Sequence, residues 1–211
     1  MKRFRSLGAF ALFFSLVATA PSLAAPVSYD IDPVHSRVEF TIRHIVSKVT
    51  GNFGDFKGTI TYDPAAPASS TTTVEIVATS IDTNNERRDN HLRSADFFDV
   101  AKFPALTFKS TKVVPGEEGK FKVEGTLSMH GVTKPIVLDA SFLGAGPGMD
   151  GSPHAGFEAS AKVDRKDYGI IWNKALDQGG TLLGDDVSIN LEIEAVASAK
   201  PEKKETAKAG K

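Results

Sequence analysis

The sequence contains no cysteine among its 211 residues. This absence excludes a disulfide framework, a cysteine nucleophile, an iron–sulfur cluster, a cysteine-ligated zinc ion and haem attached through thiols. The core must therefore stabilise the fold without covalent cross-links. Roughly 175 residues lie between the two ends of the chain, which is enough for one domain with a substantial core.

Long hydrophobic runs are scarce, and the clearest one lies near the N-terminus, from Leu7 to Val17. It follows three basic residues, and Ser22 and Ala24 place small side chains where a signal peptidase reads them. We therefore predict a secretory signal over residues 1–24, cleaved between Ala24 and Ala25, and a periplasmic location. A retained anchor is less favoured, because the run is shorter than the roughly 20 residues that span a bilayer. The chain is not expected to be an integral membrane protein.

Neither sign of charge is in large excess over the whole chain, which has a formal net charge of −1. Between the signal and the lysine-rich end, however, the chain holds 17 basic and 24 acidic residues, a net charge of −7. This balance disfavours nucleic acid or an anionic membrane surface as a partner. Residues 199–211 lack large apolar side chains and are predicted to form a disordered tail. Residues 25–198 are then the folded domain.

Apolar and polar residues alternate through most of this domain, which is typical of strands with one buried face. Eight segments show the pattern: 37–44, 56–62, 73–78, 106–111, 121–129, 136–142, 157–163 and 187–195. Amphipathic strands joined by turn-rich links predict an all-β, antiparallel sheet, and closure into an eight-stranded barrel would pair all of its edges. A two-sheet sandwich stays open from the pattern alone.

Two segments interrupt the alternation. Residues 84–100 are highly charged, and a short helix is predicted from Asp89 to Ala95. Residues 164–184 form a long link that contains Tyr168 and the only tryptophan, Trp172. Long loops in compact domains often act as lids over a site.

Motifs in these interruptions and turns resemble those of the YceI-like family of bacterial periplasmic proteins. The motifs are Asp32-Pro-Val-His-Ser-Arg-Val-Glu-Phe40, Asn90-His-Leu-Arg-Ser-Ala-Asp-Phe-Phe-Asp-Val100, Leu127-Ser-Met-His-Gly-Val-Thr-Lys-Pro135 and Asp164-Arg-Lys-Asp-Tyr-Gly-Ile170. The resemblance runs from about Ser28 to Val196, and the lysine-rich end is an extension beyond it. It implies a lipocalin-like barrel that binds a polyisoprenoid or similar long-chain lipid in the periplasm.

An eight-stranded barrel is either filled by side chains or hollow enough for one small ligand. Small residues on the apolar faces would leave room, and these are Ala78, Gly125, Ala140, Ala159 and Ala161. If the barrel is hollow, as the resemblance implies, the expected lipid-binding residues are Phe40, Ile42, His44, Phe56, Ile60, Tyr62, Phe108, Phe121, Leu127, Phe142, Phe157, Trp172 and Leu191.

The five histidines show no closely spaced metal-binding pair, so neither a metal nor a cofactor is expected. His44 is in phase with the apolar face of its strand. Two interpretations stay open for it: contact with the polar end of a ligand, or a hydrogen bond in a polar corner. His35 and His130 lie in turns and are interpreted as structural.

Three arginines, Arg87, Arg88 and Arg93, cluster in the charged segment. Guanidinium groups suit a phosphorylated isoprenoid. An ion-pair network with Glu86, Asp89, Asp96 and Asp99 is the favoured interpretation.

Catalysis has little support, because no Gly-x-Ser-x-Gly turn occurs and spacing alone offers no set of nucleophile, base and orienting group. The family resemblance implies the leading hypothesis, a periplasmic carrier or sequestering protein for a long-chain isoprenoid-type lipid, with a polyisoprenoid or quinone-like lipid as the partner. The alternatives are an accessory protein or enzyme that acts on a bound quinone-like lipid, and a structural β-domain with a filled core. A homodimer stays open.

Overall fold

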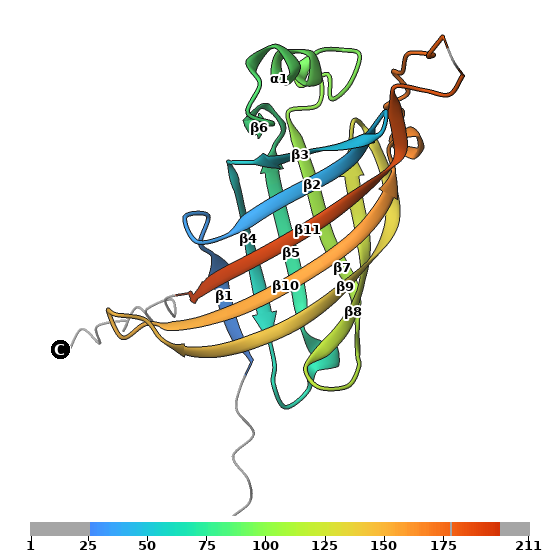
Figure 1. The fold of residues 1–211 in the computed structure, drawn as a ribbon. Helices are drawn as coiled ribbons and strands as arrows, with labels where there is room; N and C mark the ends of the chain where they lie inside the picture. Colours follow the sequence, from blue (N-terminus) through green and yellow to red (C-terminus); the bar gives the residue numbers. More distant parts are fainter. Residues whose placement is uncertain (1–25, 178, 199–211) are drawn as a thin grey trace, which may run out of the picture.

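The computed structural model describes residues 26–177 and 179–198, which form one antiparallel sheet with a short helix (Figure 1). The predicted signal, its cleavage site and the predicted tail lie outside these residues. The strands are β1 (Val27–Ile31), β2 (Arg37–His44), β3 (Ser47–Phe53), β4 (Phe56–Tyr62), β5 (Thr71–Val77), β6 (Ile81–Asp82), β7 (Ala105–Pro115), β8 (Lys120–Met129), β9 (Val132–Pro147), β10 (Pro153–Asp164) and β11 (Leu183–Ala197). The helix is α1 (Glu86–Arg93), and 3-10 turns occupy Pro67–Ser69, Ala78–Ser80 and Arg165–Tyr168.

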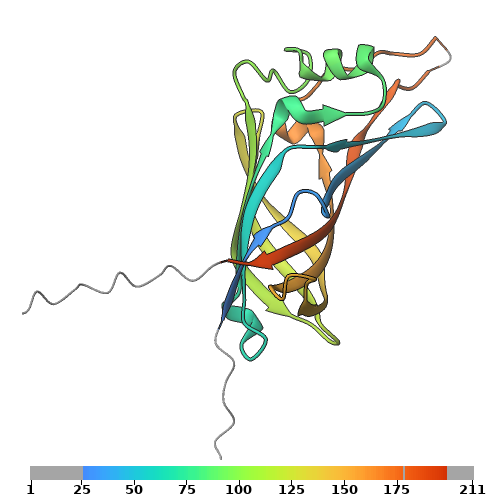
Figure 2. The same cartoon turned by 90° about the vertical axis from the view of Figure 1, so that its left-hand side faces the viewer.

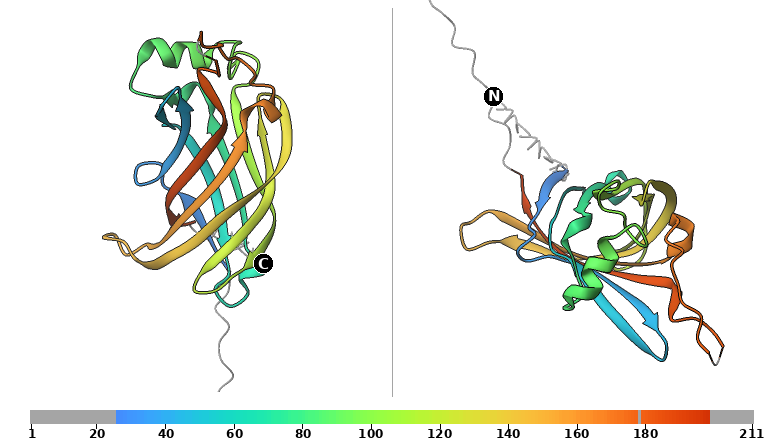
Figure 3. Two further views of the ribbon diagram at one scale, coloured as in Figure 1. Left: turned by 45° about the vertical axis from the view of Figure 1, so that its right-hand side comes forward. Right: turned by 90° about the horizontal axis from the view of Figure 1, so that it is seen from above.

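The sheet closes into a barrel (Figure 3). Eight strands form the ring in the order β1-β4-β5-β7-β8-β9-β10-β11, and β11 returns to β1 through the pairs Tyr29↔Ala197 to Ile31↔Ala195. On its other stretch β11 pairs with β2, which continues to β3 and β6. The predicted class, an eight-stranded antiparallel barrel, is confirmed.

All eight predicted segments are strands, but three further strands escaped the prediction. β1 has only five residues and β6 only two, too few for alternation to be read. β3 was missed because Gly51 interrupts its apolar face, and glycine in a sequence is typical of a turn. A Cβ at Gly51 would lie 2.6 Å from the Phe40 ring and 2.6 Å from the Thr83 side chain, so glycine is required by close packing.

Helix α1 begins three residues before the predicted start and ends at Arg93 instead of Ala95. The reason is an N-cap: the Asn85 side chain accepts a hydrogen bond of 3.0 Å from the backbone N–H of Arg88. The buried carboxylate of Asp89 then accepts hydrogen bonds from the backbone and hydroxyl of Thr83. These bonds attach the helix to the chain that leaves β6. Figure 2 shows α1 lying across one end of the barrel.

The buried apolar side chains form two clusters. The larger lies inside the barrel and includes Phe53, Phe56, Leu106, Phe108 and Ile136. The smaller contains Tyr29, Ala155 and Ala195, where β1 meets β11. Among the residues described, no helix has the length and apolar character needed to cross a membrane.

Candidate functional site

The barrel is hollow. A cavity of about 940 Å³ lies inside it, within the range of roughly 300–1,000 Å³ that is usual for ligand pockets. Its lining is dominated by apolar side chains from the ring strands, from β2 and β3, from α1 and from the long link before β11. This geometry does not fit the alternative of a structural barrel with a filled core.

The structure places eleven of the thirteen expected lipid-binding residues in the cavity lining. They are Phe40, Ile42, His44, Ile60, Tyr62, Phe108, Phe121, Leu127, Phe157, Trp172 and Leu191. Phe56 instead packs in the apolar cluster beside the β3–β4 turn, where it is 4% exposed. Phe142 stacks on Tyr62 at a centroid distance of 4.7 Å, next to a register shift between β9 and β10. Phe142 also lies 5.5 Å from Phe157, so its ring is engaged by aromatic residues that themselves line the cavity.

One end of the cavity is aromatic. Tyr62 lies 6.1 Å from Phe121 and 5.7 Å from Phe157, measured between ring centroids, and burial raises the pKa of Tyr62. Ala140 and Ala159 pair across β9 and β10 in this region and line the cavity, so these two small residues leave room as expected. The other three small residues, Ala78, Gly125 and Ala161, are not in the lining.

The opposite end of the cavity, at α1, carries further polar groups, in addition to Glu39, Ser70, Thr72 and Glu158, which line the cavity elsewhere. Its lining there includes His44, Asn85, Arg87 and His91, three of which belong to α1 or its cap. The Trp172 ring packs edge-on against His91 at 4.9 Å and lies tilted against Phe97 at 5.2 Å, measured between ring centroids. The long link therefore meets α1 over this end of the barrel, as a lid would.

The favoured ion-pair network of the arginines is wrong. Arg88 donates to the hydroxyl and carbonyl of Thr83 at 2.7 and 2.8 Å, and Arg93 donates to the carbonyls of Thr79 and Ile81 at 2.8 and 2.6 Å. The nearby acids bind other partners: Asp89 accepts from Thr83, Asp96 pairs with His91, and Asp99 pairs with Lys102. Backbone carbonyls are common acceptors for guanidinium groups, and a charge count cannot reveal them.

Arg87 differs from its two neighbours. Within the described part of the chain its side chain has no hydrogen-bond or ion-pair partner, and it contributes to the cavity lining. It is exposed, so its charge stays hydrated. The cavity thus has one cation at its polar end that is free to meet an incoming group.

Arg165 organises the link, a role that no pattern in the sequence indicates. It is 3% exposed and donates to the carbonyls of Ile170 at 2.7 Å, Trp172 at 2.8 Å and Gly184 at 2.9 Å. It also pairs with Asp185 at 3.1 Å. A hydrogen bond from Lys166 and the charges of Lys166 and Arg165 lower the pKa of the Asp185 carboxyl. From the sequence, an arginine in a polar link is expected to be exposed to solvent. In the structure Arg165 is buried, and the carbonyl groups of the link surround it.

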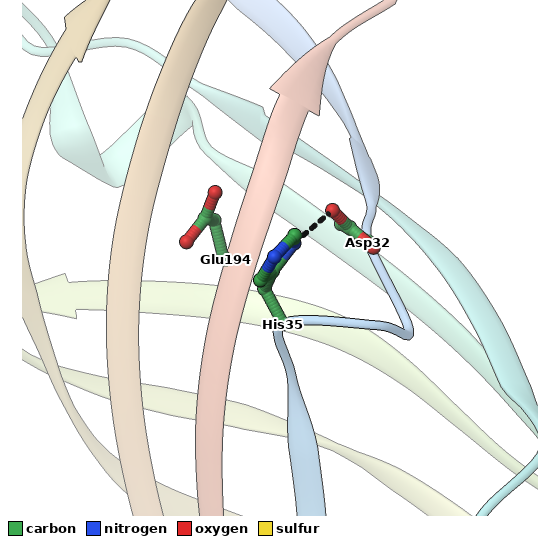
Figure 4. A group of neighbouring side chains, drawn as sticks. All are labelled: Asp32, His35 and Glu194. Atoms are coloured by element: carbon green, nitrogen blue, oxygen red, sulfur yellow. Dashed lines mark hydrogen bonds and ion pairs between the residues drawn. The ribbon is translucent and has the colours of Figure 1, made fainter. Parts of the chain in front are cut away.

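Three potential metal ligands lie together outside the cavity: Asp32, His35 and Glu194 (Figure 4). Their ligand atoms are within 4.8 Å of one another, whereas ligands around tetrahedral zinc lie about 3.3 Å apart. Asp32 already accepts hydrogen bonds from the Val34 N–H at 2.8 Å and pairs with His35 at 2.7 Å. These bonds stabilise the turn from β1 to β2, in agreement with a structural role for His35. His130, through Nδ1, bonds the Tyr168 carbonyl at 2.9 Å.

A serine, a histidine and a glutamate also align where the β9–β10 hairpin meets β11. The Ser152 hydroxyl lies 3.1 Å from His154 Nε2, and His154 Nδ1 lies 2.8 Å from Glu194. However, the Ser152 hydroxyl donates to Asp150 at 2.6 Å, which keeps its proton away from the imidazole. None of the three side chains lines the cavity. The three side chains therefore form a hydrogen-bond network that stabilises the turn.

Comparisons of sequence place the chain in a known family. The profile of the YceI-like domain matches residues 29–195. A UPF0312 protein of Azotobacter vinelandii is 41% identical over 167 residues, which cover 79% of this chain and 87% of that protein. Protein YceI of Salmonella newport shows the same identity and coverage.

Solved structures share the barrel. The Campylobacter jejuni YCEI protein has a TM-score of 0.65 and 35% identity, and the match covers 74% of this chain and 90% of that one. BcnA of Burkholderia cenocepacia has a TM-score of 0.70 at 21% identity, covering 78% and 99%. A polyisoprenoid binding domain from Saccharophagus degradans has a TM-score of 0.60 at 16% identity, covering 82% and 99%. The chain belongs to the YceI-like family.

Proposed function

We propose that this protein binds one long-chain lipid of the isoprenoid type inside its barrel and acts in the periplasm as a carrier or sequestering protein. The observation that carries the proposal is the apolar cavity of about 940 Å³. The likeness to a protein described as a polyisoprenoid binding domain supports the class of ligand.

Burial supplies the binding energy. Each CH₂ group removed from water contributes roughly 0.8 kcal/mol. Loss of translational and rotational freedom opposes this by an estimated 4–15 kcal/mol, so the net affinity is far below the gross sum. A chain of many carbons is nevertheless favoured over a short one, because each added segment inside the cavity removes more apolar surface from water.

The two ends of the cavity set the orientation of the lipid. Its tail lies toward Tyr62, Phe121 and Phe157, where the lining is aromatic. Its polar head lies toward α1, where His44 and Arg87 offer hydrogen bonds and a positive charge. Such a pair of groups suits a quinone-like or phosphorylated head. A binding role is favoured over catalysis, since the middle of the cavity offers aliphatic and aromatic side chains and one structural neighbour is described as a polyisoprenoid binding domain.

The test is to purify the mature protein from periplasmic extract, extract it with organic solvent and identify the released lipid by mass spectrometry. We expect about one long-chain isoprenoid-type lipid for each protein molecule. Ala159→Phe should narrow the cavity at its aromatic end and shift the bound lipid to shorter chains. Ser160→Phe, on the exposed face of the same strand, is the matched control and should leave the lipid unchanged. Absence of any apolar ligand from the wild type, or identical chain lengths in both variants, contradicts the proposal.

A further inference from the structure

Two protrusions beside the polar end of the cavity expose large apolar side chains. The β2–β3 hairpin turns at Ile45 and Val46, which are 41% and 97% exposed, and the link before β11 carries Ile171, which is 70% exposed. The hairpin and the link project from the same side of the barrel in all views (Figures 1, 2 and 3). A hydrogen bond of 2.8 Å from the Ile45 N–H to the Leu182 carbonyl joins them. We call the three residues Ile45, Val46 and Ile171 the docking edge.

The backbone at the hairpin turn is unusual for its sequence. Ile45 has a φ of +53°, a conformation that β-branched residues rarely adopt. A two-residue hairpin turn favours asparagine or glycine at such a position. Isoleucine is strained in this backbone conformation, and its side chain is too exposed to contribute to the core. Backbone strain that no packing contact offsets points to a functional role for the residue.

The docking edge is continuous with the cavity. His44, which precedes Ile45, lines the cavity, as do Trp172, which follows Ile171, and Leu182, which accepts the hydrogen bond from Ile45. The pairing between β11 and β2 is also irregular here, with a register shift between Leu183 and Val187. The exposed apolar residues therefore flank a part of the cavity wall where the strand pairing is interrupted.

Cations flank the docking edge, although the folded body as a whole is acidic, and the nearby acids Asp185 and Asp186 pair with Arg165, Lys166 and Lys162. Arg43 donates to the Ile45 carbonyl at 2.8 Å, which holds its guanidinium beside the apolar turn. Lys48 and Lys174 are exposed nearby, and Asp177 is the one acid in residues 43–48 and 170–177. Apolar side chains with flanking cations suit the interface of a lipid bilayer.

We propose that the docking edge inserts into the surface of a lipid bilayer and brings the polar end of the cavity against the membrane, where the lipid enters and leaves. This inference rests on the proposed function, because a lipid carrier must exchange its ligand with a bilayer. Three aliphatic side chains give weak and reversible attachment, since even a single myristoyl chain binds only marginally. The attachment is thus transient, and its strength comes mainly from apolar contact.

The experiment is co-sedimentation of the mature protein with vesicles of phosphatidylethanolamine containing a minor share of phosphatidylglycerol. Wild type is compared with Val46→Asp/Ile171→Asp, and both substituted side chains are exposed, so folding is unaffected. The control is Met149→Asp, a fully exposed apolar residue on the β9–β10 hairpin at the opposite side of the barrel (Figure 1). We expect the double variant to lose vesicle binding by about tenfold or more, and the control to keep it.

The lipid content of the same preparations separates the two proposals. A wild type that sediments with vesicles but carries no lipid overturns the proposed function and leaves the docking edge supported. Equal sedimentation of wild type and double variant overturns the docking edge, whatever the lipid content. Equal loss in the Met149→Asp control also overturns it, because attachment would then not be specific to this edge. Self-association of wild type that the double variant abolishes, without vesicle binding, would assign the edge to a second copy of the chain instead.

Discussion

The ring of Phe108 occupies the space that the absence of a side chain at Gly125 leaves open. A Cβ at Gly125 would lie 2.6 Å from two ring carbons of Phe108 and 2.6 Å from the Lys109 carbonyl oxygen. Gly125, on β8, was expected to leave room for ligand, but the neighbouring β7 fills that room with its own aromatic side chain. The shape of the cavity wall here is set by a contact between two strands.

Gly125→Ala should therefore destabilise the protein and push the Phe108 ring into the cavity. We expect a loss of about 1–3 kcal/mol in the free energy of unfolding, since the backbone oxygen of Lys109 must also move. Denaturant unfolding measures the loss, and lipid extraction should show reduced occupancy. Gly146→Ala is the control, because a Cβ there meets no atom within 4 Å. Equal stability of the two variants would show that the contact is easily relieved.

Removal of the Arg165 side chain should release the link over the polar end of the cavity. In Arg165→Met the carbonyls of Ile170, Trp172 and Gly184 lose their donor, and we expect a loss of about 3 kcal/mol in unfolding free energy. Trp172 is the only tryptophan, so a red shift of its emission reports the release directly. Lys166→Met is the control and should cost no more than about 0.5 kcal/mol, because Lys166 pairs with Asp185 at the surface. An unchanged emission spectrum in Arg165→Met would mean that other contacts hold the link.

The turn from β1 to β2 should depend on pH. The hydrogen bond that the His35 ring donates to Asp32, together with the charge of Asp32, raises the pKa of the His35 imidazole above the usual 6.5, and the same bond lowers the pKa of the Asp32 carboxyl below 3.8. Stability from His35 is therefore complete below pH 6.5 and is lost as pH rises through the raised pKa. Stability from Asp32 is present above pH 3.8 and is lost as pH falls through the lowered pKa.

NMR titration of the His35 ring tests this pair. Asp32→Asn should return the pKa of His35 toward its usual value, whereas Asp30→Asn, at an exposed position on β1, should leave it raised. If Asp32→Asn does not shift the His35 titration, the hydrogen bond does not persist in solution.

Ile45→Asn should separate stability from membrane attachment. Asparagine tolerates the left-handed conformation that Ile45 adopts, so we expect a gain of about 1 kcal/mol in unfolding free energy. Vesicle binding should fall at the same time, because an apolar side chain of the docking edge is lost. A variant that is more stable and still binds vesicles fully would show that the Ile45 side chain does not contribute to membrane attachment.

Alternation along the chain was enough to identify most of the ring strands, their inward faces and the barrel class. The physical reason is local: side chains of a strand point to opposite faces with a period of two, so one buried face leaves a readable pattern. Phe40, Tyr62, Phe121 and Phe157 were placed correctly in this way. The resemblance to the YceI-like family, read from motifs in the turns, also came from the sequence alone.

Other features were decided only by contacts between segments distant in the chain. β1 closes the ring because it meets β11, although its five residues are too short for a pattern. Phe142 packs against Tyr62 from β4 and Phe157 from β10 instead of lining the cavity, and Gly125 adds no space because the Phe108 ring covers it. Arg165 is buried because three backbone carbonyls from the link and β11 converge on it. Periodicity indicates which face of a strand is buried. It does not indicate which distant residues contact that face, because tertiary packing determines those contacts.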